Sequence, residues 1–93
     1  MDVIQEKRTR ILVVAGRYGA TNLRVFGSVV RGEAGPESDL DLLVEMEPGR
    51  SLLDHIALIH DLEEVLGCRV DMVTEKALKE RYKERVLSEA IAL

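Results

Sequence analysis

The stretch VFGSVVRGEAGPESDLDLLVE, residues 25–45, decides the fold that we expect from this sequence. Residues 22–26 alternate apolar and polar side chains up to a break at Gly27, which predicts a first strand. Residues 39–45 alternate in the same way and predict a second strand. Between them, Gly35-Pro36 is a turn signal. The stretch therefore predicts two strands joined by a connection that turns sharply at Gly27.

The rest of the chain switches between helical and strand spacing, without a repeat, a low-complexity tract or a linker. Helices are predicted over residues 3–17, 51–66 and 75–92, and a third strand over residues 68–73. We therefore expect an α/β (α+β) fold, in which a small mixed sheet of about three to four strands is flanked by helices. At 93 residues the chain has room for one domain, residues 1–93.

Two of these helices carry apolar stripes that we expect to pack inward. The helix over residues 51–66, capped by Ser51 and stopped by Gly67, has the stripe Leu52, Ile56, Ile59, Leu62 and Leu66. The helix over residues 75–92, capped by Thr74, has the stripe Leu78, Tyr82, Val86 and Leu87. His55 and His60 are five positions apart, so they lack the spacing of a zinc-binding helix and are predicted to be surface residues.

Composition excludes several classes of protein. No apolar run approaches the roughly 20 residues that span a bilayer, and a net charge of -4 argues against a surface for long nucleic acids. Residues 1–16 lack the pattern of a signal peptide. Cys68 is the only cysteine, so it has no partner for an internal disulfide. We therefore expect a cytoplasmic protein that does not bind membranes.

Gly27 and Ser28 follow the first predicted strand, where a short helix could begin. Such a turn can aim backbone N–H groups and a hydroxyl at phosphate oxygens, although an ordinary turn has the same sequence. Asp39 and Asp41 lie on one face of the second strand, because strand side chains alternate with period two. Their mutual repulsion would be relieved by divalent cations, although a solvated strand face explains the pair equally well.

Asp71 supplies a third carboxylate in the third predicted strand, between Val70 and Met72. If this strand lies beside the second, three carboxylates face the turn at Gly27. That arrangement is expected for two-metal phosphoryl transfer, in which cations align nucleophile, phosphorus and leaving group. No GxxxxGK[ST] loop and no GxGxxG motif is present to suggest another phosphate site.

Gly27-Ser28, ten intervening residues and then Asp39-x-Asp41 form a pattern that resembles the signature of the DNA polymerase beta-like nucleotidyltransferase superfamily. Three further features resemble the minimal nucleotidyltransferases of bacteria and archaea: the pair Arg31-Gly32, the step Ser38-Asp39 and the segment GCRVDMV. The resemblance extends from about Ile11 to Ala92.

This resemblance implies a role for each matching residue. Gly27 and Ser28 would hold the triphosphate of ATP, and Asp39 and Asp41 would ligate two Mg²⁺ ions. Asp71 would complete the metal site and help to deprotonate the attacking hydroxyl. Arg31 would reach the phosphates or a partner, or it is simply an exposed arginine. Ser38 would orient the loop before Asp39.

The same resemblance implies a partner, because minimal nucleotidyltransferases commonly pair with a helical HEPN protein as antitoxin and toxin. The leading expectation is transfer of AMP to a tyrosine of that partner. The alternatives are neutralisation of the partner by occlusion and transfer of a nucleotide to a small molecule. A core this small is also expected to leave apolar surface for self-association, as a homo-oligomer, or for a partner.

Overall fold

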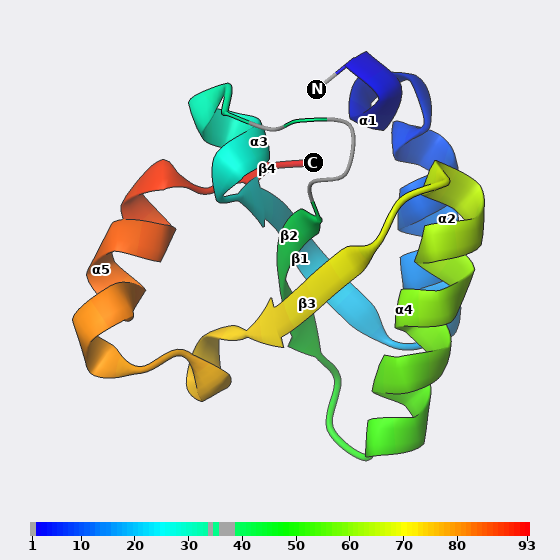
Figure 1. Cartoon of the computed structure of the whole chain (residues 1–93). Coiled ribbons are helices and arrows are strands. Elements are labelled where there is room, and N and C mark those ends of the chain that lie inside the picture. Colours follow the sequence, from blue (N-terminus) through cyan, green and yellow to red (C-terminus); the bar gives the residue numbers. More distant parts are fainter. Residues whose placement is uncertain (1, 34, 36–38) are drawn as a thin grey trace.

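The structure is a computed structural model that describes residues 2–33, 35 and 39–93. Pro36 and Ser38, and with them the predicted turn at Gly35-Pro36 and the predicted role of Ser38, lie outside the described residues. In chain order (Figure 1) the elements are α1 (Asp2–Glu6), α2 (Arg8–Arg17), β1 (Ala20–Phe26), α3 (Ser28–Arg31), β2 (Leu40–Met46), α4 (Leu52–Leu66), β3 (Val70–Thr74), the 3-10 helix η1 (Glu75–Ala77), α5 (Glu80–Glu89) and β4 (Ile91–Ala92).

Four strands form one mixed sheet in the order β3-β2-β1-β4. Strand β1 is antiparallel to both β2 and β4, whereas β2 and β3 are parallel and are connected through α4. Strand β1 begins two residues before the predicted strand, since Ala20 and Thr21 already pair with Met46 and Glu45 of β2. The predicted α/β architecture with a small mixed sheet is thus confirmed.

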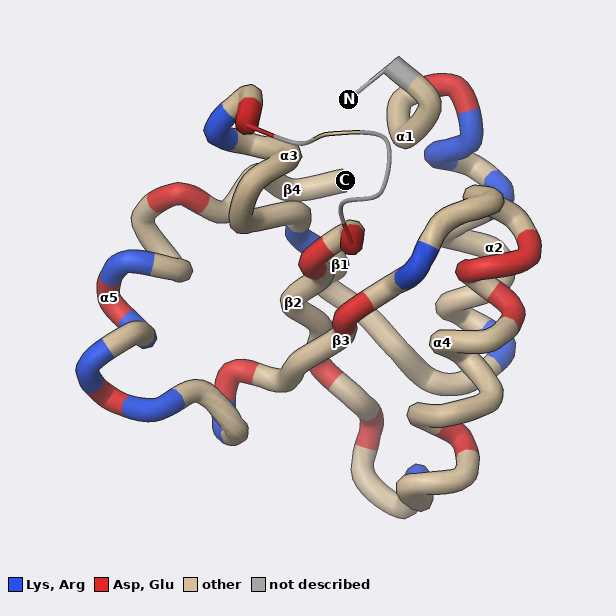
Figure 2. Tube along the Cα trace, in the orientation of Figure 1, with Lys and Arg blue, Asp and Glu red and all other residues tan. Residues whose placement is uncertain are grey.

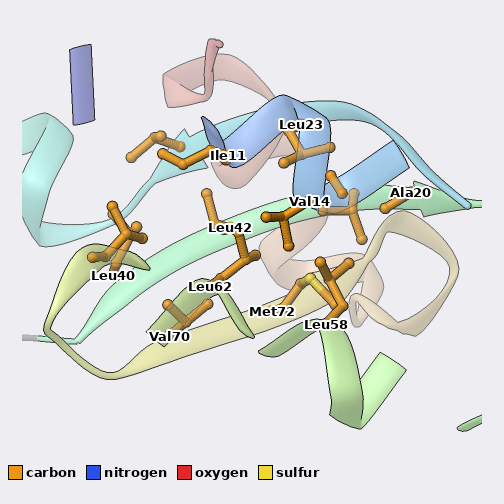
Figure 3. Packing of buried hydrophobic residues seen from close by; sticks show 14 of the residues in the cluster. Ile11, Val14, Ala20, Leu23, Leu40, Leu42, Leu58, Leu62, Val70 and Met72 are labelled. Atoms are coloured by element: carbon orange, nitrogen blue, oxygen red, sulfur yellow. The ribbon is translucent and has the colours of Figure 1, made fainter. Parts of the chain in front are cut away.

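Helices α2 and α4 lie side by side and cover one face of the sheet (Figure 1). The apolar side chains of the strands meet those of the two helices in one cluster, which Figure 3 shows from close by. Among the described residues the largest fully buried side chains are those of Ile11, Val25, Leu42, Val44, Leu58 and Leu62 in this cluster, and that of Leu43 outside it. Burial of this apolar area is the main stabilising contribution to the fold. No helix in the part of the chain described here is long and apolar enough to cross a membrane.

Helix α4 starts and ends as its sequence predicts, but its buried stripe differs from the predicted one. Ser51 and Asp54 form the capping box, and Gly67 ends the helix with a φ of 70°. The predicted stripe is wrong at Leu52 and Ile56, which are 72% and 41% exposed. The buried positions are Leu58, Leu62 and Leu66, which recur every four residues, so the face that meets the sheet is rotated from the predicted one.

This rotation brings His55 toward the sheet. Its Nε2 lies 3.2 Å from the carbonyl oxygen of Met72 in β3. The carbonyl group of Met72, in the edge strand β3, thus has a side-chain partner in α4. The prediction of a surface residue is therefore wrong for His55, which is half-buried, and is confirmed for His60, which is exposed.

The chain after β3 differs most from the prediction of a single helix over residues 75–92. The backbone is extended at Leu78, with a ψ of 131°, and again at Ala90, with a ψ of 136°. Thr74 makes no side-chain capping bond. The end of the chain instead extends the sheet through β4, where the N–H of Leu93 donates to the carbonyl of Leu23 at 3.0 Å. These backbone hydrogen bonds to a sheet edge replace those of a longer helix.

Helix α5 consequently packs less closely than predicted. Among its ten residues, all of which the structure describes, Val86 alone is buried. Tyr82, predicted to turn inward, is 46% exposed, and the guanidinium carbon of Arg81 lies 4.8 Å from the centre of its ring. Figure 2 shows how closely Lys, Arg and Glu follow one another along this helix.

Candidate active site

The face of the sheet opposite α2 and α4 carries the acidic residues. Leu40 and Leu42 are buried in the core, so the side chain of Asp41 between them points to the opposite face. Asp71 lies in the same way between buried Val70 and Met72. Asp41 and Asp71 are direct partners in the parallel pairing of β2 with β3. The structure thus brings these two carboxylates together on the face that the spacing predicts.

A turn at Gly27 lies against this acidic face. Gly27 joins β1 to α3 with a φ of 79° and a ψ of -152°, in a region that residues with a side chain rarely adopt. A Cβ atom at this position would overlap the carboxylate of Asp41. Glycine is therefore required for two reasons: the backbone conformation, and the close approach of the turn to Asp41.

Helix α3 is a single turn that starts at Ser28. The N–H groups of Val30 and Arg31 donate to the carbonyl oxygen of Gly27 at 3.1 and 3.2 Å, and the N–H of Glu33 donates to that of Ser28 at 2.9 Å. Ser28, half-buried, is thus the first helical residue after the turn, where the sequence predicts a short helix.

The ionised form of the Asp41 carboxyl group is disfavoured in this position. Burial raises the pKa of its carboxyl group, and the negative charges of Asp71 and Asp39 raise it further, while Arg31 lowers it. Asp39 directly precedes β2 and is exposed, as is Asp71. A divalent cation with oxygen ligands would relieve the repulsion among these carboxylates. Within the described residues, however, no three His, Cys, Asp or Glu side chains are close enough together to hold a metal ion, so a three-carboxylate metal site stays a prediction.

Glu89, the last residue of α5, is a member of this site that the sequence analysis missed. Its Oε1 accepts hydrogen bonds from the N–H of Gly27 at 2.9 Å and from Nη1 of Arg31 at 3.0 Å. The bond from Gly27 and the charge of Arg31 lower the pKa of Glu89, so it remains ionised at neutral pH. No local pattern indicates this contact, since Glu89 and Gly27 are 62 positions apart and the acidic residues of this segment fit a solvated helix face.

Arg31 is held between two carboxylates. Its Nη1 donates to Glu89, and its Nε donates to Oε2 of Glu33 at 3.2 Å. The hydrogen bonds to Glu33 and Glu89 raise the pKa of the guanidinium group above its usual value. Arg31 therefore lies beside the turn, as the sequence predicts, and its side chain is bound to glutamates of this chain. Its predicted contact with phosphates stays a prediction.

Two relatives have extensive sequence similarity to this chain. A candidate protein adenylyltransferase of Methanocaldococcus jannaschii is 40% identical over 88 residues, which cover 95% of this chain and 95% of the relative. The protein adenylyltransferase MntA of Thermococcus cleftensis is 47% identical over 75 residues, which cover 81% of this chain and 76% of the relative.

Solved structures resemble this fold. One, described as that of a candidate minimal nucleotidyltransferase, is 52% identical, with a TM-score of 0.88 over 99% of this chain and 94% of that chain. A chain of a toxin-antitoxin crystal structure with AMP-PNP has a TM-score of 0.75 over 90% of this chain and 69% of that chain, and at 19% identity it shows the fold alone. Residues 11–93 match the family described as the nucleotidyltransferase domain. The chain therefore belongs to the nucleotidyltransferase domain family and is an enzyme of its minimal type.

Proposed function

We propose that this chain transfers AMP from ATP to a hydroxyl group of a partner protein, with Mg²⁺ as cofactor. The acceptor oxygen would bond to the α-phosphorus while the bond from that phosphorus to the bridging oxygen breaks, releasing pyrophosphate. The observation that supports this most strongly is the position of Asp41, which has Asp71 as its strand partner and lies against the glycine turn. Such a juxtaposition of carboxylates and a turn suits phosphoryl chemistry.

The turn would bind the triphosphate. Ser28 offers a hydroxyl group and a backbone N–H at the start of α3, where the first N–H groups have no partner within the helix. Because Gly27 has no side chain, the turn can lie directly against the carboxylate of Asp41. The triphosphate would therefore lie between Ser28 and the carboxylates.

Asp41 and Asp71, which are strand partners, supply the chemical type of ligand that a hard divalent cation takes. The raised pKa of Asp41 reflects burial and the charges of Asp71 and Asp39, and carboxylate oxygens are the ligands that Mg²⁺ takes in proteins. Asp39 and Asp41 would hold two Mg²⁺ ions, with Asp71 as the third ligand. When bound, these ions would neutralise charge on the triphosphate and on the leaving pyrophosphate.

Asp71 would also act on the acceptor. It is exposed beside Asp41, so an acceptor hydroxyl delivered by another molecule could reach it. A tyrosine is a demanding acceptor, because the usual pKa of a phenol is about 10 and little of it is ionised at neutral pH. The Asp71 carboxylate would accept its proton as the oxygen approaches phosphorus.

The names of the two relatives support a protein as acceptor, since both are called protein adenylyltransferases. The family resemblance points to a HEPN-type helical partner and to an antitoxin role, in which modification of a tyrosine silences the partner. A toxin-antitoxin chain with the same fold, crystallised with AMP-PNP, is consistent with that assignment.

The test is mass spectrometry of the neighbouring gene's product after incubation with ATP, Mg²⁺ and this chain. The expected result is a gain of one AMP unit on a tyrosine for each modified site, lost without the metal. The matched control is the double variant Asp39→Asn, Asp41→Asn. If the double variant silences the partner as well as the wild type does, and no modification is found, occlusion replaces catalysis. If AMP appears only on an added small molecule, the proposal that the acceptor is a protein is wrong.

A further inference from the structure

The turn at Gly27, which we propose binds the nucleotide, is contacted by one residue near the end of the chain, Glu89. We infer that Glu89 is a positioning residue for nucleotide binding, which fixes the turn at Gly27 and keeps Arg31 beside it. This inference rests on the proposed function of the turn and adds a residue that neither the family pattern nor the spacing of the chain points to.

Glu89 accepts a hydrogen bond from the N–H of Gly27, the residue of the turn whose φ of 79° and ψ of -152° are unusual. The carbonyl oxygen of Gly27 accepts hydrogen bonds from the N–H groups of Val30 and Arg31 in α3. Glu89 binds the N–H of Gly27 at 2.9 Å. The two peptide groups that flank the Cα atom of Gly27 are thereby each held by a hydrogen bond, one through its N–H and the other through its carbonyl oxygen. Because Gly27 is the residue with the greatest backbone freedom, it gains most from such a restraint.

Glu89 itself is well anchored. It ends α5, and two residues later Ile91 of β4 pairs with Val25 of β1, the strand that leads into the turn. The side chain of Glu89 is 19% exposed, against 35% for Arg31. A carboxylate placed next to the sheet thus restrains a turn that follows directly on a strand of the same sheet.

Arg31 acts through Glu89 in this arrangement. Its Nη1 lies 3.0 and 3.3 Å from the two oxygens of Glu89, and its Nε binds Glu33. With Nε and Nη1 bound to glutamates of the chain, the guanidinium group serves to hold Glu89 against the turn. Its positive charge also offsets the negative charge of Glu89 near a triphosphate.

The experiment compares Glu89→Ala and Glu89→Gln with Glu84→Ala, which removes the same charge from an exposed position of α5. Affinity for ATP is measured by calorimetry well below the melting temperature, so that a loss of stability alone does not alter the result. We expect the Kd to rise about 10- to 100-fold in Glu89→Ala, the scale of a displaced binding group. Glu89→Gln, which can still accept from Gly27, should lie in between, and Glu84→Ala should match the wild type.

Kinetics and a double-mutant cycle separate positioning from general destabilisation. In transfer assays KM should rise more than kcat falls, because the turn holds the nucleotide before and during the reaction. Arg31→Ala should weaken ATP binding in the wild type and add little to Glu89→Ala, since Arg31 acts through Glu89. An additive loss would assign Arg31 to the phosphates directly and overturn this part of the inference.

Two other outcomes would overturn the inference as a whole. A folded Glu89→Ala that binds ATP within about twofold of the wild type would leave Glu89 a structural residue only. Tighter binding would mean that Glu89 masks the turn. If Glu89→Ala does not fold, Glu89→Gln decides by the same criterion. The proposed function fails in a different way: the wild type itself then binds no ATP, or Asp41→Asn binds it unchanged.

Discussion

The two faces of the sheet differ in this protein: one is covered by helices and apolar, and the other carries acidic residues. Strand β2 contributes side chains to both faces. Leu42 is fully buried beneath α2 and α4, whereas Asp41, one residue earlier, points to the other face beside Asp71 and the glycine turn. Figure 3 shows the dense apolar packing on the first face, and Figure 2 shows acidic segments where β2 starts and in β3. One face therefore carries the main core, whereas the other combines fully buried Leu43 with charged groups that can do chemistry.

Arg24 shows that the second face is not packed for stability alone. Its Nε and Nη2 are buried and make no hydrogen bond within the described part of the chain, and the nearest carboxylate, that of Glu75, is 3.8 Å from Nη2. A buried polar group without a hydrogen bond costs about 1–3 kcal/mol. Among the described residues no polar or charged residue is buried as a whole on either face, so these two buried atoms of Arg24 stand out.

The largest effect is expected on the packed face. Leu62→Ala should lower the free energy of unfolding by about 2–5 kcal/mol, because it opens a cavity where the side chain is fully buried. In the same helix Leu52→Ala, at a position that is 72% exposed, should change it by less than about 0.5 kcal/mol. Urea denaturation followed by circular dichroism measures both. Similar losses in the two variants would contradict the assignment of the buried face of α4.

The second largest effect is expected at Gly27, in the turn between β1 and α3. Gly27→Ala should lower the free energy of unfolding by about 1–3 kcal/mol, since alanine is strained at a φ of 79° and its Cβ would displace Asp41. The same variant should lose binding of ATP. The matched control is Gly16→Ala in α2, where a Cβ meets no atom within 4 Å and should stabilise the helix by about 0.5–1 kcal/mol. Full ATP binding by Gly27→Ala would remove this turn from the site.

The smallest effect is a gain on the acidic face. Asp41→Asn should raise the free energy of unfolding at pH 7 by less than about 1 kcal/mol, the scale of single charge interactions on a partly exposed side chain. The pKa of Asp41 is raised in the folded protein, so its ionised form destabilises at neutral pH. This destabilisation disappears as the pH falls through the raised pKa of Asp41. The difference in the free energy of unfolding between Asp41→Asn and the wild type should disappear with it.

Thermal melting as a function of pH measures this gain. The control is Glu64→Gln, which removes one negative charge at an exposed position. Asp41→Asn should also abolish most of the stabilisation that ATP and Mg²⁺ give the wild type, since a ligand that binds only the folded state raises its stability. A variant that is less stable than the wild type at pH 7 would argue against repulsion at Asp41.

The sequence predicted what depends on local spacing. Alternation in residues 39–45 placed Leu42 and Asp41 on opposite faces, and the break at Gly27 located the turn. The contact between Glu89 and Gly27 could not be predicted in this way, because it joins segments 62 positions apart. Strand β4 was missed for a related reason: two residues have no periodicity of their own, and they form a strand only because the edge of β1 is available.

The most direct test of the central claim, that the acidic face with its glycine turn is the nucleotide site, is a titration of the labelled protein with ATP and Mg²⁺ followed by NMR. We expect backbone amide shifts to change most at Gly27, Ser28, Asp41 and Asp71, and least at Leu58 and Leu62 on the covered face. Changes centred on α2 and α4, with the amide of Gly27 unmoved, would contradict this claim.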